Sequence, residues 1–375
     1  MALYIGLMSG TSMDAVDAAL VDFVDERARP VAFHSEPYPA DLRTALGISL
    51  HSNPTLSLEH LGRLDVQVGK VFGQAALAVL ALAVVSPNRV VAVGSHGQTL
   101  LHRPQGPERF SWQIGDPNLI AAMTGIRTVA DFRRADLALG GQGAPLVPAF
   151  HAAVFRTPDE DRVVLNIGGI ANLTVLPGDA SQPVTAFDCG PGNALLDEWA
   201  ERHLARPFDR DGAWARRGRT DAALLVRLKS DPYFRALPPK STGRDYFNLG
   251  WLQERVGEEL NTILPEDLQA TLLALTVETI GQDLDRYAPN APEVLLCGGG
   301  SANQTLVEML TAALAGRQVY RTDRYGLDAR QVEASAFAWL AKRRLEGLPG
   351  NLPSVTGASR TAVLGAIYEG RPPGG

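Results

Sequence analysis

The chain has 375 residues and a formal net charge of −6, from 35 Lys and Arg against 41 Asp and Glu; without a basic excess, nucleic acid is not an expected partner. A hydrophobic share of 45% fits a soluble globular protein, and this length favours two domains with a ligand cleft between them. The start lacks the basic region of a secretory signal, and the apolar stretch from Ala75 to Val85 is shorter than the ~20 residues that cross a bilayer. Two cysteines support neither a disulfide framework nor a zinc site. A cytoplasmic protein without membrane contact is therefore expected.

Short apolar strands that each enter a glycine-rich turn alternate with helical stretches, which predicts an α/β fold. Two strands have a return strand directly after their turn and predict similar hairpins in different halves of the chain. In chain order, the predicted elements are a strand at 3–8 with its return at 16–21, a helix at 59–85, a strand at 162–167 with its return at 172–176, a strand at 184–187, helices at 194–203 and 267–287, a strand at 293–297, and helices at 304–314 and 332–345. A break at Asp131 to Gly143 predicts the passage to the second domain.

Three glycine-rich turns are candidates for phosphate binding. Gly10-Thr11-Ser12 and Gly168-Gly169 each lie between paired strands, where consecutive backbone N–H groups can meet an anion. The alternative for both is a plain hairpin turn. Gly298-Gly299-Gly300 precedes a helix, so a phosphate or a flat ligand can lie against its backbone. Because the chain has neither a GxGxxG nor a GxxxxGK[ST] pattern, a nucleotide would be bound by another scheme.

Several side chains near these turns are candidates for chemistry. Asp188 ends an apolar strand, where its carboxylate can act as a general base; the alternative is a helix cap or a turn residue. Asp14 would hold Mg²⁺ through water, or else stabilise the first turn. His96 would bind a polar substrate, or else be a packed, hydrogen-bonded residue. For three further acids near turns or helix starts, Asp116, Asp131 and Glu333, the local sequence does not separate catalytic from structural use.

Together, two glycine hairpins, a strand-end aspartate and a glycine triplet before a helix resemble the scheme of actin, sugar kinases and Hsp70, which clamps ATP between two domains. Nine longer motifs follow in order: GLMSGTSMD at 6–14, SHGQT at 95–99, QIGDPN at 113–118, VADFRRAD at 129–136, GGQGAPLVP at 140–148, NIGGIANLT at 166–174, PKSTGR at 239–244, CGGG at 297–300 and GNLPSVTGA at 350–358. These motifs resemble those of the anhydro-N-acetylmuramic acid kinases and span nearly the whole chain.

That resemblance implies a two-domain actin-like ATPase fold with an interdomain active-site cleft, and a homodimer. Its domains would be 1–130, completed by 357–375, and 131–356. The reaction implied is the opening of 1,6-anhydro-N-acetylmuramic acid by water, with transfer of the γ-phosphate of ATP to O6, in cell-wall recycling. Asp188 would be the general base, and Mg²⁺ would assist, with Asp14 as its water-mediated ligand.

The implied ATP-binding residues are Ser9, Gly10, Thr11, Ser12, Met13, Asp14, Ala15, Val16, Asp17, Asn166, Gly168, Gly169, Gly298, Gly299 and Gly300. The implied substrate-binding residues are His96, Gly97, Gln98, Asp116, Arg133 and Glu333. The chain has Met13, Ala15 and Cys189 where the family commonly has Leu, Gly and Thr, and Cys189 predicts a site sensitive to thiol oxidation.

Two other functions fit the same turns. One is a different sugar kinase or a phosphatase-like ATPase, because a fold does not determine its substrate. The other is a non-catalytic ATP-dependent regulator, which would not need a carboxylate aimed at a sugar. The motifs outside the phosphate turns favour the kinase.

Overall fold

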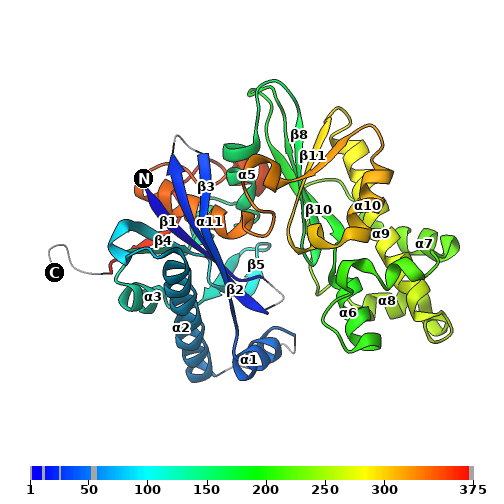
Figure 1. The fold of residues 1–375 in the computed structure, drawn as a ribbon, viewed down its shortest axis with the longest axis horizontal. Helices are drawn as coiled ribbons and strands as arrows, with labels where there is room; N and C mark the ends of the chain where they lie inside the picture. The colour runs from blue at the N-terminus through cyan, green and yellow to red at the C-terminus, as the bar shows by residue number, and fades with distance from the viewer. Residues whose placement is uncertain (1, 11–12, 25–26, 52–56, 371–375) are drawn as a thin grey trace. The chain divides into compact units, whose positions relative to one another are not determined.

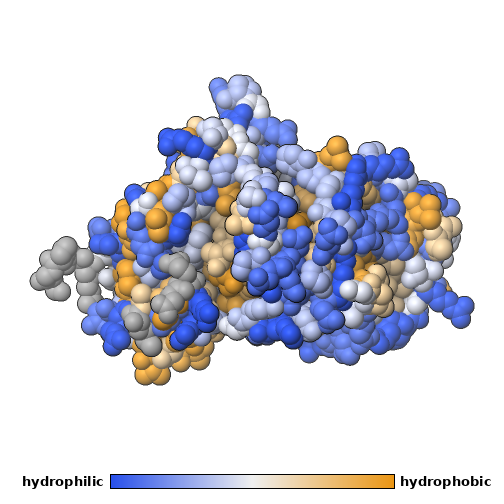
Figure 2. Space-filling model, turned by 90° about the horizontal axis from the view of Figure 1, so that it is seen from above, coloured by the Kyte–Doolittle hydropathy of each residue, from blue (hydrophilic) through white to orange (hydrophobic). Residues whose placement is uncertain are grey.

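The computed structural model describes residues 2–10, 13–24, 27–51 and 57–370. Its chain divides into two compact units. The first unit is Met1–Val154 with Gly326–Gly375, and the second is Phe155–Tyr325. On the face that Figure 2 shows, hydrophilic residues cover most of the surface, and hydrophobic residues gather in separate spots.

The first unit is built on a six-stranded sheet in the order β13-β7-β4-β1-β2-β3 (Figure 1). Strands β1 to β3 are antiparallel neighbours, while β4 is parallel to β1 and β7 is parallel to β4. The strands are β1 (Leu3–Met8), β2 (Ala15–Val24), β3 (Arg27–Pro37), β4 (Val90–Ser95), β7 (Thr128–Ala130) and β13 (Ala366–Tyr368), with a separate hairpin of β5 (Gln98–Arg103) and β6 (Phe110–Ile114). The helices are α1 (Ala40–His51), α2 (Leu58–Ala83), α3 (Pro117–Thr124), α4 (Arg134–Ala138), α5 (Val147–Phe155), α11 (Val332–Leu345) and α12 (Pro353–Thr356).

The second unit is built on a five-stranded sheet in the order β10-β9-β8-β11-β12. Strands β8 to β10 are antiparallel neighbours, and β11 is parallel to both β8 and β12. The strands are β8 (Arg162–Ile167), β9 (Ile170–Leu176), β10 (Thr185–Pro191), β11 (Glu293–Cys297) and β12 (Gln318–Arg321). The helices are α6 (Ala194–Leu204), α7 (Ala222–Lys229), α8 (Leu249–Val256), α9 (Pro265–Tyr287) and α10 (Gln304–Ala313).

The two units share one topology. In each, three strands form an antiparallel meander, and the next two strands continue the sheet in parallel on the other side of the first strand. Crossover helices make the parallel connections, as parallel pairing requires: α2 leads to β4, α9 leads to β11, and α10 leads to β12. The predicted α/β fold with two domains is confirmed, and so are the two predicted hairpins, β1–β2 and β8–β9.

Helices α2 and α11 cover opposite faces of the first sheet. Successive side chains of a strand point to opposite sides, so neighbouring residues of β1 show which helix lies on which face. Ile5 and Leu7 of β1 belong to the apolar cluster that includes one face of α2. Gly6, between them, faces α11, where a Cβ atom would collide with the carbonyl of Ala334. By length and composition alone α2 could cross a membrane, and half of its most apolar window is buried inside the protein.

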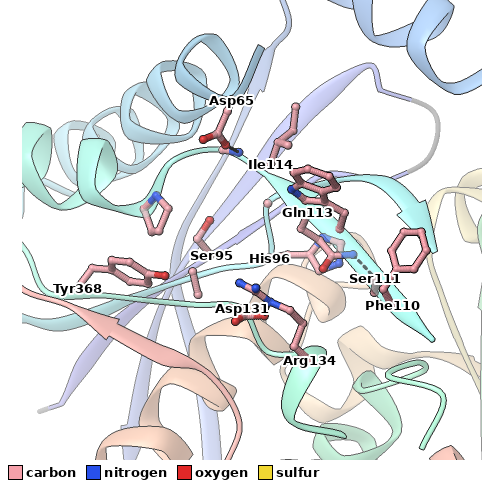
Figure 3. Close-up of a pocket in the computed structure, with 15 residues that line it drawn as sticks. Asp65, Ser95, His96, Phe110, Ser111, Gln113, Ile114, Asp131, Arg134 and Tyr368 are labelled. Atoms are coloured by element: carbon pink, nitrogen blue, oxygen red, sulfur yellow. Dashed lines mark hydrogen bonds and ion pairs between the residues drawn. The ribbon is translucent and has the colours of Figure 1, made fainter. Parts of the chain in front are cut away.

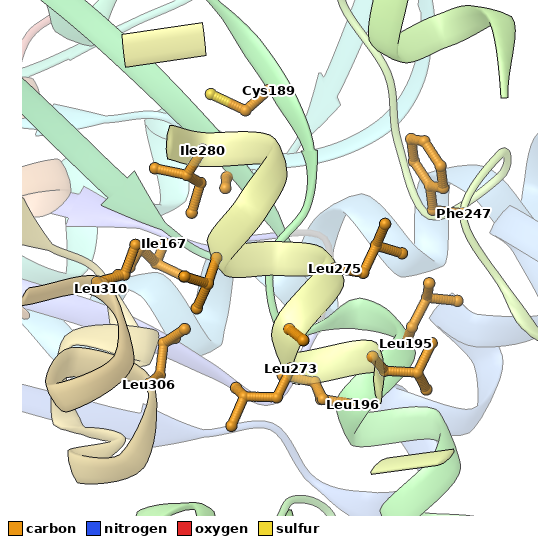
Figure 4. Close-up of a cluster of buried hydrophobic side chains, with 14 of the residues drawn as sticks. Ile167, Cys189, Leu195, Leu196, Phe247, Leu273, Leu275, Ile280, Leu306 and Leu310 are labelled. Atoms are coloured by element: carbon orange, nitrogen blue, oxygen red, sulfur yellow. The ribbon is translucent and has the colours of Figure 1, made fainter. Parts of the chain in front are cut away.

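The core of the second unit surrounds α9. Its side chains Leu273, Leu275 and Ile280 are buried together with Leu306 and Leu310 of α10 (Figure 4). A hydrophobic side chain is stabilised by about 1.5–3 kcal/mol when it is fully buried. This cluster therefore fixes the sheet on which the second glycine hairpin lies.

The observed division of the chain differs from the predicted boundaries at 130/131 and 356/357. Asp136 is fully buried and accepts hydrogen bonds from Asn351 Nδ2 at 2.6 Å and Thr356 Oγ1 at 2.8 Å. Gln142 N donates to Thr356 O at 2.8 Å, which joins the same two segments. Because α11 also packs on β1 and β4, both the segment after residue 130 and the segment from residue 326 belong to the first unit.

Two local expectations at β10 and α6 are corrected. The strand predicted to end at 187 continues to Pro191, because its pairing with β9 resumes after a bulge between Asp188 and Gly190. Asn193 precedes α6 as expected, but its side chain makes no capping hydrogen bond. Its Nδ2 instead donates to the carbonyls of Ile167 and Gly168, at 3.3 and 3.0 Å.

Candidate active site

The candidate residues gather at one edge of each sheet. In the second unit β8, β10 and β11 run in the same direction, so their carboxyl ends lie at the same edge. That edge carries Gly168-Gly169, Asp188 and Gly298-Gly299-Gly300. In the first unit the carboxyl ends of β1, β4 and β7 likewise bring together Gly10, His96 and the segment from Asp131. Ligands of α/β proteins bind outside the carboxyl ends of strands.

Buried polar groups hold the first glycine turn. Ser9 is 2% exposed, and its Oγ donates to Gln98 Oε1 at 2.7 Å. Gln98 is fully buried, accepts a further bond from Tyr38 Oη at 3.4 Å, and donates through Nε2 to Gly10 O at 3.4 Å. The structure thus gives Gln98 a role in holding this turn. Thr11 and Ser12 lie outside the described residues.

The space next to Gly10 is open. A Cβ atom built there would meet no atom within 4 Å. On β2, Val16 is buried, and Asp17 accepts a hydrogen bond from Ser35 Oγ at 2.7 Å. Burial raises the pKa of Asp17, against the opposing effects of Ser35 and Arg330.

Asp14, the candidate Mg²⁺ ligand, forms an ion pair with Arg43 of α1. Its Oδ1 lies 2.7 Å from Arg43 Nη2, and both side chains are more than half exposed. An exposed pair of this kind contributes at most about 1 kcal/mol, so Asp14 can leave Arg43 for another partner. Among the described residues there is no group of three or more His, Cys, Asp or Glu side chains that could hold a metal alone.

His96 and Arg133 form a buried pair behind the first edge. Nε2 of His96 lies 2.7 Å from Nη2 and 3.1 Å from Nε of Arg133, so it is the acceptor for both N–H groups. Burial and the charge of Arg133 lower the pKa of His96 well below its ordinary value, and the ring is neutral. Burial lowers the pKa of Arg133 to about 10, against the opposing charge of Glu333 in the first turn of α11.

A cavity of about 400 Å³ opens beside this pair (Figure 3). Its lining includes His96 and Gly97, together with the half-exposed rings of Phe110 and Trp112 on β6. Gly97 has a φ of 74°, and a Cβ atom there would stand 2.7 Å from Ile114 O. The cavity therefore combines aromatic surface with polar groups, as small-molecule sites commonly do. Asp116 instead caps α3, where its Oδ1 accepts from Asn118 N at 2.9 Å.

The glycine turns of the second unit are packed against each other with the side chains of Asn166 and Asn193 between them. Cys297 of β11 pairs with Asn166 of β8, which places the triplet beside the hairpin. Gly298 has a φ of 80°, and a Cβ atom there would collide with Asn166 Oδ1. Gly299, by contrast, faces open space. Backbone N–H groups of 192–194 bond the carbonyls of Gly168 and Gly169 at 2.9–3.0 Å, which fixes the hairpin.

Asp188 is held at the bulge of β10, a feature that re-aims side chains and is frequent beside active sites. Its Oδ2 accepts from Thr242 N at 2.9 Å and from Ser241 Oγ at 3.0 Å. Burial raises the pKa of Asp188, while the bonds from Thr242 and Ser241 and the charge of Lys240 oppose that rise. A raised pKa brings a carboxylate closer to the range in which a general base is effective.

A buried ion pair lies behind Asp188. Lys240 Nζ is 2.9 Å from Asp283 Oδ2, with 3% and 6% of the side chains exposed. Cys189 is fully buried, and burial and the charge of Asp283 raise its thiol pKa well above the ordinary value. Because the thiolate is the oxidisable form, the predicted sensitivity of Cys189 to oxidation is not supported.

A second cavity, of about 300 Å³, lies at the same edge of the second unit. Gly299, Ala302 and Asn303 line one part of it, and Asn193 and Asp197 line another. The ring of Phe208, which is 50% exposed, also lines it. Such a cavity offers a flat ligand both backbone and an aromatic ring.

The family model that matches the chain and its relatives of known name agree on one family. The family model described as anhydro-N-acetylmuramic acid kinase matches residues 2–370. The chain belongs to this family. A relative of that name from Coxiella burnetii (strain Dugway 5J108-111) is 49% identical over 98% of this chain and 97% of its own length. One from Xanthomonas campestris pv. campestris (strain 8004) is 51% identical over 98% of this chain and 97% of its own length. One from Shewanella frigidimarina (strain NCIMB 400) is 50% identical over 98% of both chains.

As a member of the anhydro-N-acetylmuramic acid kinase family, the chain is a sugar kinase whose candidate residues lie in two sets. One set, around Gly10, His96 and Arg133, lies in the first unit, and the other, around Asp188 and the two glycine turns, lies in the second. Sequence reasoning missed Ser241, Thr242 and Lys240 as the residues that hold Asp188. The PKSTGR motif at 239–244 contains all three and was the available signal.

Proposed function

We propose that this protein opens the 1,6-anhydro ring of 1,6-anhydro-N-acetylmuramic acid with water and phosphorylates O6 with ATP, giving N-acetylmuramic acid 6-phosphate and ADP. The observation that carries the proposal is Asp188. Its carboxylate lies at the carboxyl edge of the sheet beside two glycine turns, and both bonds that orient it end on Oδ2. Oδ1 makes no hydrogen bond to the described part of the chain, and it is the oxygen that we propose takes a proton from water.

In this mechanism Asp188 takes a proton from water as the water oxygen bonds to C1 of the sugar. The C1–O6 bond breaks, and O6 takes the γ-phosphoryl group as its bond to ADP breaks; the proton on Asp188 is released afterwards. Ser241 and Thr242 keep the carboxylate oriented throughout. His96 and Arg133, with Gly97, Gln98, Asp116 and Glu333, are proposed to contact or support the sugar.

The glycine turns fit a nucleotide. Gly10 and Gly299 have open space where a side chain would project, so backbone N–H groups can approach phosphate oxygens closely. The cavity beside Gly299 and Phe208 is the proposed place of the adenosine. Bound Mg²⁺ would neutralise charge on the phosphates, and Asp14, released from Arg43, is its proposed ligand through water.

Replacing Phe208 by alanine is expected to raise the KM for ATP by about tenfold, because stacking of a base on an aromatic ring contributes about 1–3 kcal/mol. The KM for the sugar should change little. Steady-state kinetics with each substrate varied would measure both. Phe110→Ala, which removes an exposed ring from the cavity of the first unit, is the control and should leave the KM for ATP unchanged; equal effects of the two variants would contradict the assignment.

Replacing Ser241 by alanine is expected to shift the acidic limb of the kcat profile to higher pH. The hydroxyl of Ser241 lowers the pKa of Asp188, so its loss raises that pKa, and the active carboxylate form requires a higher pH. At alkaline pH the loss in kcat should be less than about tenfold, since one hydrogen bond is removed. A full pH–rate profile would show it, and a profile that stays in place would argue against Asp188 as the titrating base.

We also propose that the protein works in the cytoplasm as a homodimer, as the family resemblance implies. Light scattering should then give twice the chain mass of 40.1 kDa.

The function itself is tested by ADP release and product mass with 1,6-anhydro-N-acetylmuramic acid, N-acetylmuramic acid and N-acetylglucosamine offered in parallel. Phosphorylation of the anhydro sugar alone supports the proposal. Turnover of another sugar would favour a different sugar kinase, and ATP binding without any sugar turnover would favour a regulator.

A further inference from the structure

The side chain of Arg244 lies against the Gly168-Gly169 turn. A Cβ atom built on Gly169 would stand 2.8 Å from Nε, 3.2 Å from Nη2 and 3.4 Å from Cζ of Arg244. The guanidinium thus occupies the space that any side chain at 169 would require. Glycine at this position lets a positive charge rest directly on the turn between β8 and β9.

The hydrogen-bonding capacity of this guanidinium is not fully used within the described part of the chain. Nε of Arg244 is buried and has no hydrogen-bond partner there. The carboxylate paired with it, Asp197, lies 3.6 Å from Nη2, beyond the length of a good hydrogen bond. A buried donor without an acceptor costs about 1–3 kcal/mol, and a bound oxyanion would remove that cost.

Arg244 is held on the same segment that orients Asp188. Ser241 and Thr242 bond the carboxylate, and three residues beyond Arg244 the ring of Phe247 is fully buried. The carbonyl of Arg244 also accepts a bond from Asn248 Nδ2 at 3.0 Å, just before α8. Its backbone is therefore fixed on both sides, and its guanidinium lies against Gly169.

Resting on the function proposed above, we infer that Arg244 contacts the γ-phosphoryl group of ATP and stabilises its charge during transfer to the sugar. Guanidinium groups bind phosphate oxygens through a planar pair of N–H donors, and charge spreads over the three oxygens of the transferring group. Arg244 keeps its proton throughout; at phosphorus the bond to ADP breaks and the bond to O6 forms, while the C1–O6 bond breaks as described above.

Arg244→Ala should lower kcat by at least about 100-fold, in the direction of the losses seen when a phosphoryl-stabilising arginine is absent. Added guanidinium ion should restore part of that activity, which a purely structural arginine would not allow. Arg235→Ala is the matched control: it removes the same charge from an exposed position in the same unit and should retain full activity. Thermal unfolding of both variants checks the fold.

Binding of Mg²⁺ with ADP or with a non-hydrolysable ATP analogue tests the contact without any sugar. The ratio of the affinity for the analogue to the affinity for ADP should be lower in Arg244→Ala than in the wild type. The affinity of the variant for ADP should stay within about threefold of the wild-type value. If the variant is folded and keeps kcat, or if both nucleotides lose affinity equally, the inference is overturned. Because this measurement needs no turnover, it decides on Arg244 even if the wild type proves to phosphorylate a different sugar.

Discussion

Asp188→Asn should lower kcat for sugar phosphorylation by about 10²–10⁴-fold, the usual contribution of a general base. Asparagine has the same shape and can still accept the bonds from Ser241 and Thr242, so orientation is kept and only proton acceptance is lost. Nucleotide affinity should change little, because the carboxylate is proposed to face water and sugar rather than phosphate. Coupled ADP-release kinetics and nucleotide titration would measure the two quantities.

The control for this variant is Asp285→Asn, which neutralises a carboxylate that is 78% exposed on α9. It should retain wild-type activity. A folded Asp188→Asn variant that kept kcat within about threefold of the wild type would contradict the role of Asp188 as general base, because loss of a general base lowers kcat by about 10²–10⁴-fold. The base would then have to be sought among the carboxylates of the first unit, Asp17 included.

Lys240→Met is expected to lower the free energy of unfolding by about 3–5 kcal/mol, since it leaves Asp283 buried without its partner. Burial raises the pKa of Asp283, and Lys240 opposes that rise. Without Lys240 the pKa rises further, so the folded variant must take up a proton that the unfolded chain does not hold at neutral pH. The deficit should therefore be larger at pH 8 than at pH 5.

The double variant Lys240→Met with Asp283→Asn is the test of that explanation. It removes both charges, so most of the lost stability should return and the extra dependence on pH should disappear. Urea denaturation of the wild type, Lys240→Met, Asp283→Asn and the double variant at two pH values measures this. A double variant as unstable as Lys240→Met alone would contradict the explanation that the unpaired charge of Asp283 causes the loss of stability.

The strands, the glycine turns and the long helices were predictable from local patterns. β11 and α11 have the predicted ends, 293–297 and 332–345, because each is a dense apolar segment between clear turn signals. The continuation of β10 through Asp188 was not predictable in this way. It depends on pairing with β9 across a bulge, and the residues after the bulge, Gly190 and Pro191, read locally as a turn.

Contacts between distant segments account for the other differences. The burial of Asp136 by Asn351 and Thr356 decides the division of the chain, and no local pattern reveals it. Gly6 in the middle of an apolar strand was a usable signal, because an isolated glycine in a strand often marks a close approach of another backbone, here that of α11. Arg244 gave no such signal, since its role depends on lying against Gly169.

The most direct test of the proposed reaction is the mass of the product formed from ATP, Mg²⁺ and 1,6-anhydro-N-acetylmuramic acid in ¹⁸O-water. The product is sampled early. Preformed N-acetylmuramic acid 6-phosphate kept in the same water is the control that measures exchange of oxygen with the solvent. Opening of the ring by water activated at Asp188 predicts a sugar phosphate that carries one solvent oxygen beyond the exchange control. A sugar phosphate without that label, or no sugar phosphate at all, would contradict it.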